Sequence, residues 1–331
     1  MTLHLTYAGN LYDRTAALAS GAVRPEGISL NYLGLTSPEV FWRMLQFQEF
    51  DASELSCANY FMLRSRGDAR FVAIPIFPSR SFRHGFVFVN AASGIVAPAD
   101  LKGRRVGIAE YQMTAALWIR AFLQHDYGVL PGEFTWVTGG LEQPGRRDRV
   151  PTPPPPGVRL EGAPSDRGLV QLLEDGELDA LFSPSTPSTF RAGSPRIARL
   201  FPDFPSVEAD YYRRTGLFPI MHTVVLRRDV YERHPWAAQS LFKAFLQAQA
   251  LALEALHETD VLAVSLAWAA AYAEREAALV GDGSSLWQHG FLPNRHVLEA
   301  LKGYLAEQGL LERDFPLEDA FAPSTLQAFR H

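Results

Sequence analysis

The feature that most constrains the fold is an alternation of short apolar β runs with amphipathic helical segments, which occurs twice along the chain. In the first alternation the expected strands are 3–7, 28–33, 50–55 and 71–75, and the expected helices are 11–19, 38–47 and 56–64. In the second alternation the expected strands are 106–109, 134–137 and 178–182, and the expected helices are 114–126 and 168–175. Strands that alternate with helices form parallel sheets covered by helices, so the pattern predicts two α/β units.

Two longer β runs, Gly85–Asn90 and Met221–Leu226, stand before and after the second alternation. Beyond the later run, the pattern changes to long helices rich in Ala and Leu between Tyr231 and Val280, and a further helix is expected from Val297 to about Gln308. This order predicts that the chain leaves a first lobe, builds a second lobe, and then returns to complete the first.

The expected architecture is therefore a two-lobed α/β fold with a central cleft and two crossing strands. The first lobe is expected to comprise residues 1–89 and 224–331, and the second lobe residues 90–223. Two-lobed solute-binding proteins have this arrangement. Their ligands lie in the cleft, where the carboxyl ends of strands meet helix N-termini.

The charge balance narrows the range of partners. The chain has 31 Lys and Arg against 36 Asp and Glu, a net charge of −5, so a nucleic-acid partner is not expected. Only three of the basic residues are lysines, and none lies near a motif, which argues against Schiff-base catalysis: Lys102, Lys243 and Lys302. The remaining 28 are arginines, the side chains that bind carboxylates bidentately.

Other sequence signals point to a cytoplasmic protein without a membrane span. The single cysteine, Cys57, allows neither an internal disulfide nor a CxxC site. The first residues alternate like a strand and show no signal peptide, and no apolar run reaches the ~18 residues of a membrane helix. The nucleotide-binding, zinc-protease and hydrolase motifs GxGxxG, GxxxxGK[ST], HExxH and GxSxG do not occur in the expected contexts.

Five segments dense in polar groups fall where a cleft is expected. In Phe50–Ser56, Glu54 and Ser56 would reach the cleft rim; alternatively Ser53 or Ser56 caps a helix and Glu54 is solvated. In Phe77–His84, Arg80, Arg83 and His84 lie among aromatic residues. Paired cations fit a bound dianion, because a buried carboxylate without a partner costs several kcal/mol. The alternative for this segment is an exposed basic loop.

The third segment, Glu110–Thr114, joins a strand to a helix. There Thr114 would cap the helix and contact an anion, Glu110 would face the cleft, and Tyr111 and Gln112 are further candidate contacts. The alternative is that Thr114 is only a helix cap.

The fourth and fifth segments bring two more histidines. His222 begins an apolar β run; it is either a core residue or, like His84, a residue at the cleft floor. In Trp287–Arg295, His289 and Arg295 would close over a ligand, while Asn294 alternatively only caps the next helix.

A loop between residues 139 and 165 contains seven prolines, including Pro153–Pro156, and also carries Arg146, Arg147 and Arg149. It is either a solvated polyproline excursion or a flap or contact between copies of the chain. The long C-terminal helices are a second candidate interface for a homo-oligomer.

Six strings in order give the chain a family resemblance. They are Phe50–Glu54, Phe77–His84, Glu110–Ala115, Pro202-Asp203 with Tyr211-Tyr212, Gly216–His222 and Asn294-Arg295. Together they resemble the 4,5-dihydroxyphthalate decarboxylase family, and the match runs from Tyr12-Asp13 to Glu307–Leu310. The resemblance implies a type 2 periplasmic-binding-protein fold used as a cytoplasmic lyase of aromatic compound degradation, in phthalate catabolism.

The implied reaction is the non-oxidative loss of one carboxylate from 4,5-dihydroxyphthalate, which gives protocatechuate and carbon dioxide. Each ring carboxyl lies para to a hydroxyl, so electron density from that oxygen can reach the carbon that must be protonated. We hypothesise that Arg80 and Arg83 hold the carboxylates, that His84 or His222 is the acid, and that Glu54 or Glu110 accepts from the hydroxyls.

This scheme requires no cofactor, although a catechol with nearby His and Glu could also chelate a divalent metal. Two other functions stay open at this point. One is a solute-binding protein for an aromatic acid, and the other is a different cytoplasmic enzyme on the same fold that acts on another ring.

Overall fold

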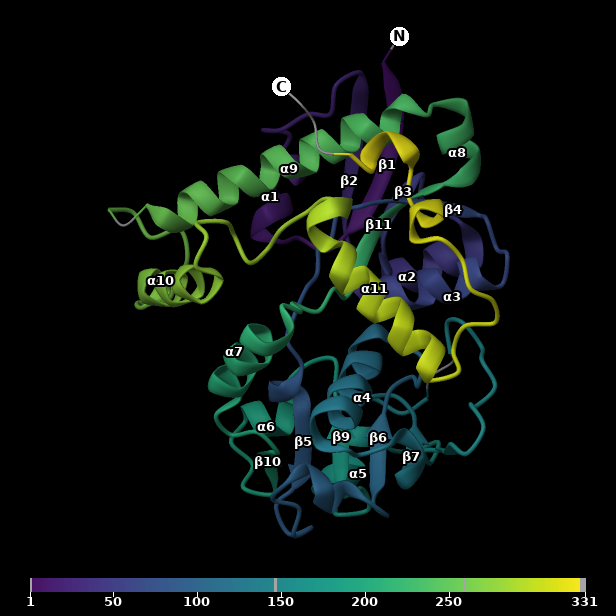
Figure 1. The fold of residues 1–331 in the computed structure, drawn as a ribbon, viewed down its shortest axis with the longest axis vertical. Helices are drawn as coiled ribbons and strands as arrows, with labels where there is room; N and C mark the ends of the chain where they lie inside the picture. The colour runs from purple at the N-terminus through teal and green to yellow at the C-terminus, as the bar shows by residue number, and fades with distance from the viewer. Residues whose placement is uncertain (1, 146–147, 259, 328–331) are drawn as a thin grey trace. The chain divides into compact units, whose positions relative to one another are not determined.

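The computed structural model describes residues 2–145, 148–258 and 260–327, and these residues form two compact units (Figure 1). Unit 1 comprises residues 1–80, 220–299 and 313–331, and unit 2 comprises residues 81–219 and 300–312. The sequence placed the boundaries at 89/90 and 223/224 and assigned the whole C-terminal part to the first lobe.

Residues 300–312 belong to unit 2 because of their side-chain contacts. Tyr304 packs edge-on against Trp118 with ring centroids 5.5 Å apart, and Gln308 accepts a hydrogen bond from Arg120 at 2.7 Å. Sequence periodicity identifies this segment as a helix but carries no information about which sheet it covers.

Unit 1 is built on a five-stranded sheet with the order β2-β1-β3-β11-β4. Its strands are β1 (Leu3–Gly9), β2 (Ile28–Gly34), β3 (Ala52–Ser56), β4 (Phe71–Ile74) and β11 (His222–Arg227). β1 runs parallel to β2 and β3, whereas β11 is antiparallel to β3 and β4. The sheet is therefore mixed rather than parallel. β11 enters it after the excursion into unit 2, and not through the helical crossover that a parallel neighbour requires.

Unit 1 also contains seven helices among its described residues. They are α1 (Asp13–Ala19), α2 (Ser37–Phe47), α3 (Cys57–Ser65), α8 (Arg228–Arg233), α9 (Trp236–His257), α10 (Ala269–Val280) and the first part of α11 (Phe291–Glu307), and of these α10 packs on α9. Leu241 and Phe245 of α9 belong to one buried cluster with Tyr7 and Val224 of the strands. Figure 1 shows α9 lying across the strands of this sheet. This cluster packs β1 and β11, which β3 separates in the sheet, beneath the long helix.

Unit 2 has a six-stranded sheet with the order β10-β5-β9-β6-β7-β8. Its strands are β5 (Val87–Asn90), β6 (Arg105–Ile108), β7 (Thr135–Thr138), β8 (Arg159–Gly162), β9 (Ala180–Phe182) and β10 (Ile197–Arg199), and its helices are α4 (Thr114–Tyr127), α5 (Leu169–Glu174), α6 (Ser188–Arg191) and α7 (Phe204–Thr215). β6 to β9 are parallel, and β5 is antiparallel to β9 and β10. Short 3-10 turns occur at His84–Phe86, Pro98–Leu101, Pro131–Glu133, Leu317–Ala320 and Pro323–Thr325.

The two long β runs were expected to be the strands that cross between the lobes, but each lies within the sheet of a single unit. Residues 84–86 form a 3-10 turn, so only Val87–Asn90 is a strand, and it lies within the sheet of unit 2. The later run, β11, lies within the sheet of unit 1. The chain thus passes between the units before each run begins.

The proline-rich loop contains more structure than a solvated excursion would. Residues 146–147 lie outside the described residues, but Val150 and Pro155 are buried and Arg159–Gly162 form β8 at the sheet edge. The loop therefore packs against its own unit over part of its length. α6, α7 and β10 were also missed by the sequence analysis, since they are short or broken by polar residues.

Candidate functional site

Glu54 is the buried acid at the centre of the polar residues of unit 1. It lies on β3, is fully shielded from solvent, and its carboxylate accepts hydrogen bonds from Tyr12 Oη at 2.6 Å and from the backbone N–H of Asn10 at 3.0 Å. Burial raises the pKa of the Glu54 carboxyl, but the neighbouring His222 and these two donors outweigh the burial and leave the pKa below its usual value. Glu54 is therefore held as a carboxylate.

His222 is the partner that completes this arrangement. It begins β11, opposite Ser56 in the antiparallel pairing with β3, so its ring lies diagonally across from Glu54 on the same face. Its Nδ1 lies 2.5 Å from Glu54 Oε1, and Phe41 packs edge-on against the ring with centroids 4.8 Å apart. Among the described residues, Nε2 of His222 has no hydrogen-bond partner, and it is not one of the fully buried atoms. The contact with Glu54 thus fixes the imidazole ring through Nδ1 and leaves Nε2 available to a ligand.

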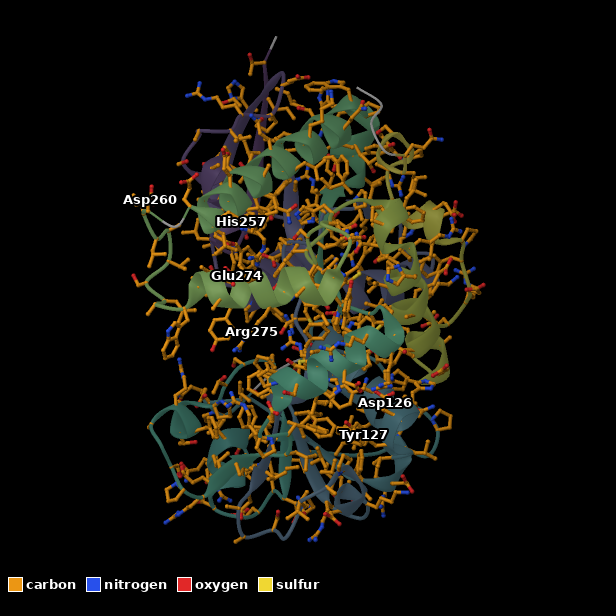
Figure 2. The ribbon with its side chains drawn as sticks, turned by 60° about the vertical axis from the view of Figure 1, so that its left-hand side comes forward. Asp126, Tyr127, His257, Asp260, Glu274 and Arg275 are labelled. Atoms are coloured by element: carbon orange, nitrogen blue, oxygen red, sulfur yellow. The ribbon has the colours of Figure 1, made fainter. Side chains whose placement is uncertain are left out.

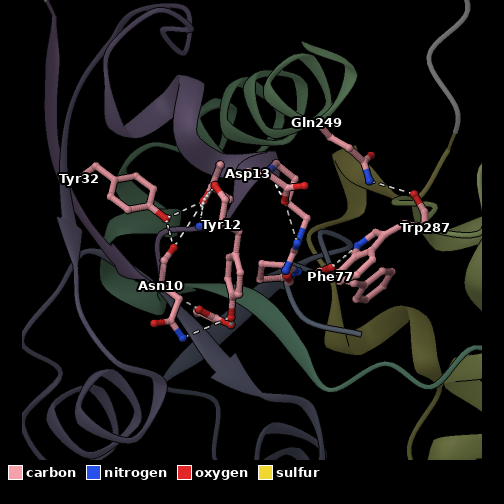
Figure 3. A network of polar contacts seen from close by, with 11 residues as sticks. Asn10, Tyr12, Asp13, Tyr32, Phe77, Gln249 and Trp287 are labelled. Atoms are coloured by element: carbon pink, nitrogen blue, oxygen red, sulfur yellow. Dashed lines mark hydrogen bonds and ion pairs between the residues drawn. The ribbon is translucent and has the colours of Figure 1, made fainter. Parts of the chain in front are cut away.

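Tyr12 and Asn10 belong to this network and were missed by the sequence analysis. The side-chain amide of Asn10 donates to Ser37 Oγ at 2.6 Å, and Tyr32 Oη donates to the Asn10 carbonyl at 2.5 Å (Figure 3). The only signal in the sequence was that the family resemblance begins at Tyr12. Ser56 is buried and caps α3 by accepting from Asn59 N at 3.4 Å, which is the helix-cap alternative.

Arg80 is tied to the segment that follows α10. Its Nη1 donates to Asn294 Oδ1 at 2.7 Å and to the Gln288 carbonyl at 3.0 Å. The Asn294 amide donates to the carbonyls of Gln288 and Gly290. Asn294 is not a helix cap, because α11 begins at Phe291, before the expected start.

The two remaining candidates of this segment differ in exposure. His289 is buried, and its Nδ1 accepts the backbone N–H of Phe77 at 3.1 Å; burial and the charge of Arg80 lower its pKa to about 3. Arg295 lies on the exposed surface of α11 and is ion-paired with Glu299 and Glu318. Its pairing is that of an ordinary surface arginine, and it is a weaker candidate for contact with a ligand.

His84 lies in unit 2 in an aromatic surrounding. Its ring stacks on Phe122 with centroids 3.9 Å apart and meets Phe201 and Tyr211 edge-on. Neither ring nitrogen has a hydrogen-bond partner among the described residues, and burial lowers the pKa of His84 to about 4. Near neutral pH this histidine is uncharged.

Glu208 on α7 is the acid nearest to His84, at 3.9 Å from Nδ1. It accepts from Gly85 N at 3.1 Å, and burial raises its pKa to about 7. Burial lowers the pKa of His84 and raises the pKa of Glu208, so both shifts favour the uncharged side chains. A separation of 3.9 Å therefore does not by itself make this contact an ion pair. Arg83 nearby is buried, donates to the Pro184 carbonyl at 3.0 Å, and has its pKa lowered to about 10 by burial.

The Glu110–Thr114 segment forms a second buried cluster in unit 2. Glu110 is ion-paired with Arg149 of the proline-rich loop, with Nε at 2.9 and 3.2 Å from its two oxygens. Gln112 donates to the Val150 carbonyl at 3.0 Å. The helix cap is Met113 rather than Thr114, which is the first residue of α4. The loop thus covers this segment, and sequence proximity gave no sign of the Glu110–Arg149 pair.

Tyr111 stacks on a buried arginine that the sequence analysis did not identify. The guanidinium of Arg120 lies 3.9 Å from the Tyr111 ring centroid, and Trp136 packs edge-on against the same ring. Among the described residues, Arg120 Nη1 and Nη2 and Tyr111 Oη have no hydrogen-bond partner. Burial lowers the pKa of Arg120.

A cavity of about 540 Å³ lies apart from these residues, between α9 and α10 in unit 1. Its lining includes Leu253, Val264, Tyr272 and Glu276, and burial raises the pKa of Glu276. Figure 2 shows His257 at the end of α9 and Glu274 and Arg275 on α10. No predicted site residue lines this cavity, and an interface between copies at these helices stays a prediction.

Within residues 2–145, 148–258 and 260–327, no three His, Cys, Asp or Glu side chains gather in a way that could hold a metal ion. In the same described part, no helix is long and apolar enough to cross a membrane.

Comparison with curated proteins identifies two relatives, both named 4,5-dihydroxyphthalate decarboxylase. The protein from Comamonas testosteroni is 38% identical over 328 residues, covering 99% of this chain and 99% of its own length. The protein from Pseudomonas putida is 37% identical over 211 residues, covering 64% of this chain and 82% of its own length. No family model matches the chain.

Solved structures resemble the chain in fold. The periplasmic aliphatic sulphonate binding protein of Escherichia coli has a TM-score of 0.54 at 13% identity, with 98% of each chain covered. A mutant of the desulfurization enzyme DSZB, in complex with biphenyl-2-sulfinic acid, has a TM-score of 0.54 at 17% identity, again with 98% of each chain covered. A Candida albicans protein with the generic periplasmic binding protein fold has a TM-score of 0.52 at 12% identity, covering 100% of this chain and 99% of its own. The expected two-lobed, type 2 periplasmic-binding-protein-like fold is thus confirmed.

Proposed function

Because the chain belongs to the 4,5-dihydroxyphthalate decarboxylase family, we propose that it removes one carboxylate from 4,5-dihydroxyphthalate, with His222 as the proton donor. The products are protocatechuate and carbon dioxide, and no oxidant or reductant takes part. The observation that carries the assignment of His222 is the Glu54–His222 pair, in which a buried carboxylate holds Nδ1 and leaves Nε2 without a partner among the described residues.

The reaction needs a proton at the ring carbon that loses its carboxylate. Nε2 of His222 delivers this proton, and the C–H bond forms while electron density flows in from the hydroxyl para to that carbon. The para hydroxyl gives its proton to a base as the dienone-like ring forms. When the C–C bond to the carboxylate breaks and carbon dioxide leaves, the ring regains aromaticity and the oxygen takes its proton back, while solvent reprotonates His222. Glu54 accepts from Nδ1, fixes the ring orientation and stabilises the charged imidazole, as carboxylates do for catalytic histidines.

This assignment gives Glu54 a different role from the one expected from the sequence. A carboxylate that already accepts from Tyr12, Asn10 and His222 has little capacity left for a substrate hydroxyl. Glu54 is therefore a positioning residue. Glu110 stays a prediction as the acceptor, and Arg80 and Arg83 stay predictions as carboxylate ligands.

The test is to incubate the purified protein with 4,5-dihydroxyphthalate and to follow protocatechuate by chromatography and carbon dioxide by trapping. We expect both products in equal amounts. Tight binding without product would favour a solute-binding protein, and absence of binding would favour an enzyme that acts on a different ring.

The same assay after treatment with a chelator addresses metal dependence. We propose that the reaction uses no cofactor, so turnover should be unchanged after the chelator has been removed by gel filtration. Loss of turnover that a divalent metal restores would instead support a metal chelated by the catechol oxygens.

A further inference from the structure

We infer that Arg14, clamped between Tyr12 and Trp287, forms a binding site for a carboxylate of the aromatic substrate. The chemical class of the ligand rests on the proposed function, whereas the cation site itself rests on geometry within unit 1. Arg14 was not among the arginines singled out from the sequence.

The guanidinium of Arg14 is held in place from both sides. Its Cζ lies 4.0 Å from the ring centroid of Tyr12 and 3.9 Å from that of Trp287. Its Nε donates to the Pro78 carbonyl at 2.7 Å. Trp287 is itself fixed, because its indole N–H donates to the Phe77 carbonyl at 3.0 Å (Figure 3). A planar cation held between two rings is preorganised, so less conformational entropy is lost when an anion binds.

Of the two terminal nitrogens of Arg14, one has an exposed carboxylate as its partner, and the other has no hydrogen-bond partner among the described residues. Nη1 pairs with Asp13 Oδ1 at 2.9 Å, but the Asp13 side chain is 67% exposed. Nη2 has no hydrogen-bond partner among the described residues and is not one of the fully buried atoms. Because the Asp13 carboxylate is largely exposed to water, its ion pair with Arg14 contributes little, and a ligand carboxylate can displace it and engage both Nη atoms bidentately.

The site is connected to the proposed proton donor through Tyr12 and Glu54. Tyr12, whose ring stacks on Arg14, donates from its hydroxyl to the Glu54 oxygen that also holds His222. Arg14 and Glu54 are close enough to influence each other's charge. One tyrosine therefore connects the cation to the catalytic pair, and a ring anchored by its carboxylate at Arg14 would lie beside His222.

The experiment measures binding of benzene-1,2-dicarboxylate, a probe without hydroxyls, by isothermal titration calorimetry. We expect Arg14→Gln to weaken its affinity by roughly 10- to 100-fold, the loss typical of a charge-assisted hydrogen bond. Asp13→Asn should tighten binding by a few fold, because the competing carboxylate is gone. Arg24→Gln, the same change at an exposed arginine of the same unit, is the matched control and should leave affinity unchanged.

A second probe separates charge recognition from general damage. Catechol has no carboxylate, so its affinity should be the same in the wild type and in Arg14→Gln, and the thermal unfolding curves should agree. If Arg14→Gln does not fold, Arg14→Lys serves instead and should retain part of the affinity. Equal affinity for the dicarboxylate in the wild type and the Arg14 variant, or an unchanged affinity in Asp13→Asn, would overturn the inference.

Failure of this inference is distinguishable from failure of the proposed function. If binding of the dicarboxylate depends on Arg14 but 4,5-dihydroxyphthalate is not turned over, the carboxylate site is supported and the proposed decarboxylase function is contradicted. If turnover is normal but binding of the dicarboxylate does not depend on Arg14, the decarboxylase function is supported and the carboxylate site at Arg14 is contradicted.

Discussion

His222 in unit 1 and His84 in unit 2 stand in similar sequence settings but in opposite environments. Each comes at or just before an apolar β run, and both were candidates for the catalytic acid. Among the described residues, Nδ1 of His222 lies against a carboxylate and its Nε2 has no hydrogen-bond partner, whereas His84 is stacked on Phe122 and neither of its nitrogens has a hydrogen-bond partner.

Under the proposed function, the carboxylate at Nδ1 distinguishes His222 from His84, whereas the places of the two histidines in the chain are alike. A carboxylate at one ring nitrogen fixes the tautomer and the orientation of the ring, whereas burial lowers the pKa of His84 to about 4. Substitutions at the two histidines and at the acids beside them test this contrast.

Replacement of His222 by Asn should lower kcat for 4,5-dihydroxyphthalate by roughly 100- to 10,000-fold, the usual worth of a positioned general acid. Asn keeps a polar group at the site but cannot carry the proton. Steady-state kinetics with product chromatography measures the effect, and binding of benzene-1,2-dicarboxylate should persist as the control. A variant with near-full kcat would place the acid elsewhere.

Replacement of Glu54 by Gln should lower kcat by roughly 10- to 1,000-fold, less than loss of the histidine. The amide retains the shape of the side chain but removes the charge that stabilises the imidazolium, and it turns a donor toward Asn10 N–H or His222. The effect should appear in kcat, and the pH–rate profile should shift; a change in KM alone would contradict a positioning role.

Glu208 should make the stability of the protein depend on pH. In the folded protein the pKa of Glu208 is about 7, above the ordinary value of 4.5. The contribution of protonated Glu208 to the free energy of unfolding is therefore fully present below pH 4.5 and is lost as pH rises toward about 7. Relative to Glu208→Gln, the free energy of unfolding of the wild type should fall by roughly 1–3 kcal/mol across this window. Urea unfolding of both proteins at pH 4.5 to 8 measures the difference, and parallel curves would refute the raised pKa.

Replacement of His84 by Phe should have the smallest effect on catalysis, with kcat within about threefold of the wild type. Phe preserves the stacking on Phe122 and removes two buried nitrogens that lack partners among the described residues. Its effect on unfolding should be slight or stabilising near neutral pH. A kcat loss comparable to that of His222→Asn would reverse the comparison between the two histidines.

Most of the regular elements could be predicted, because burial on one side leaves a period in the sequence. The helices 114–127 and 37–47 and the strands 3–9 and 28–34 lie close to their expected limits. The start of α11, by contrast, was expected at Val297 and lies at Phe291. The polar segment before Val297 is stabilised by contacts with Arg80, which no local pattern reveals.

The candidate site was predictable in its parts but not in its pairings. Glu54 and His222 were both identified from their segments, but they are 168 residues apart, and their contact depends on the register of β3 and β11. Arg14 was missed because an arginine after an aspartate is indistinguishable from a surface ion pair until Trp287 is seen on its other side.

The sequence by itself determined the α/β alternation, the excursion and return of the chain, and the family to which it belongs. These properties are written in local periodicity and in ordered strings of residues. The tertiary structure decided which histidine has a carboxylate, which arginine lies between two rings, and which sheet residues 300–312 join. Those are relations between residues far apart in the chain, and burial and charge act on them only after the strands and helices have packed.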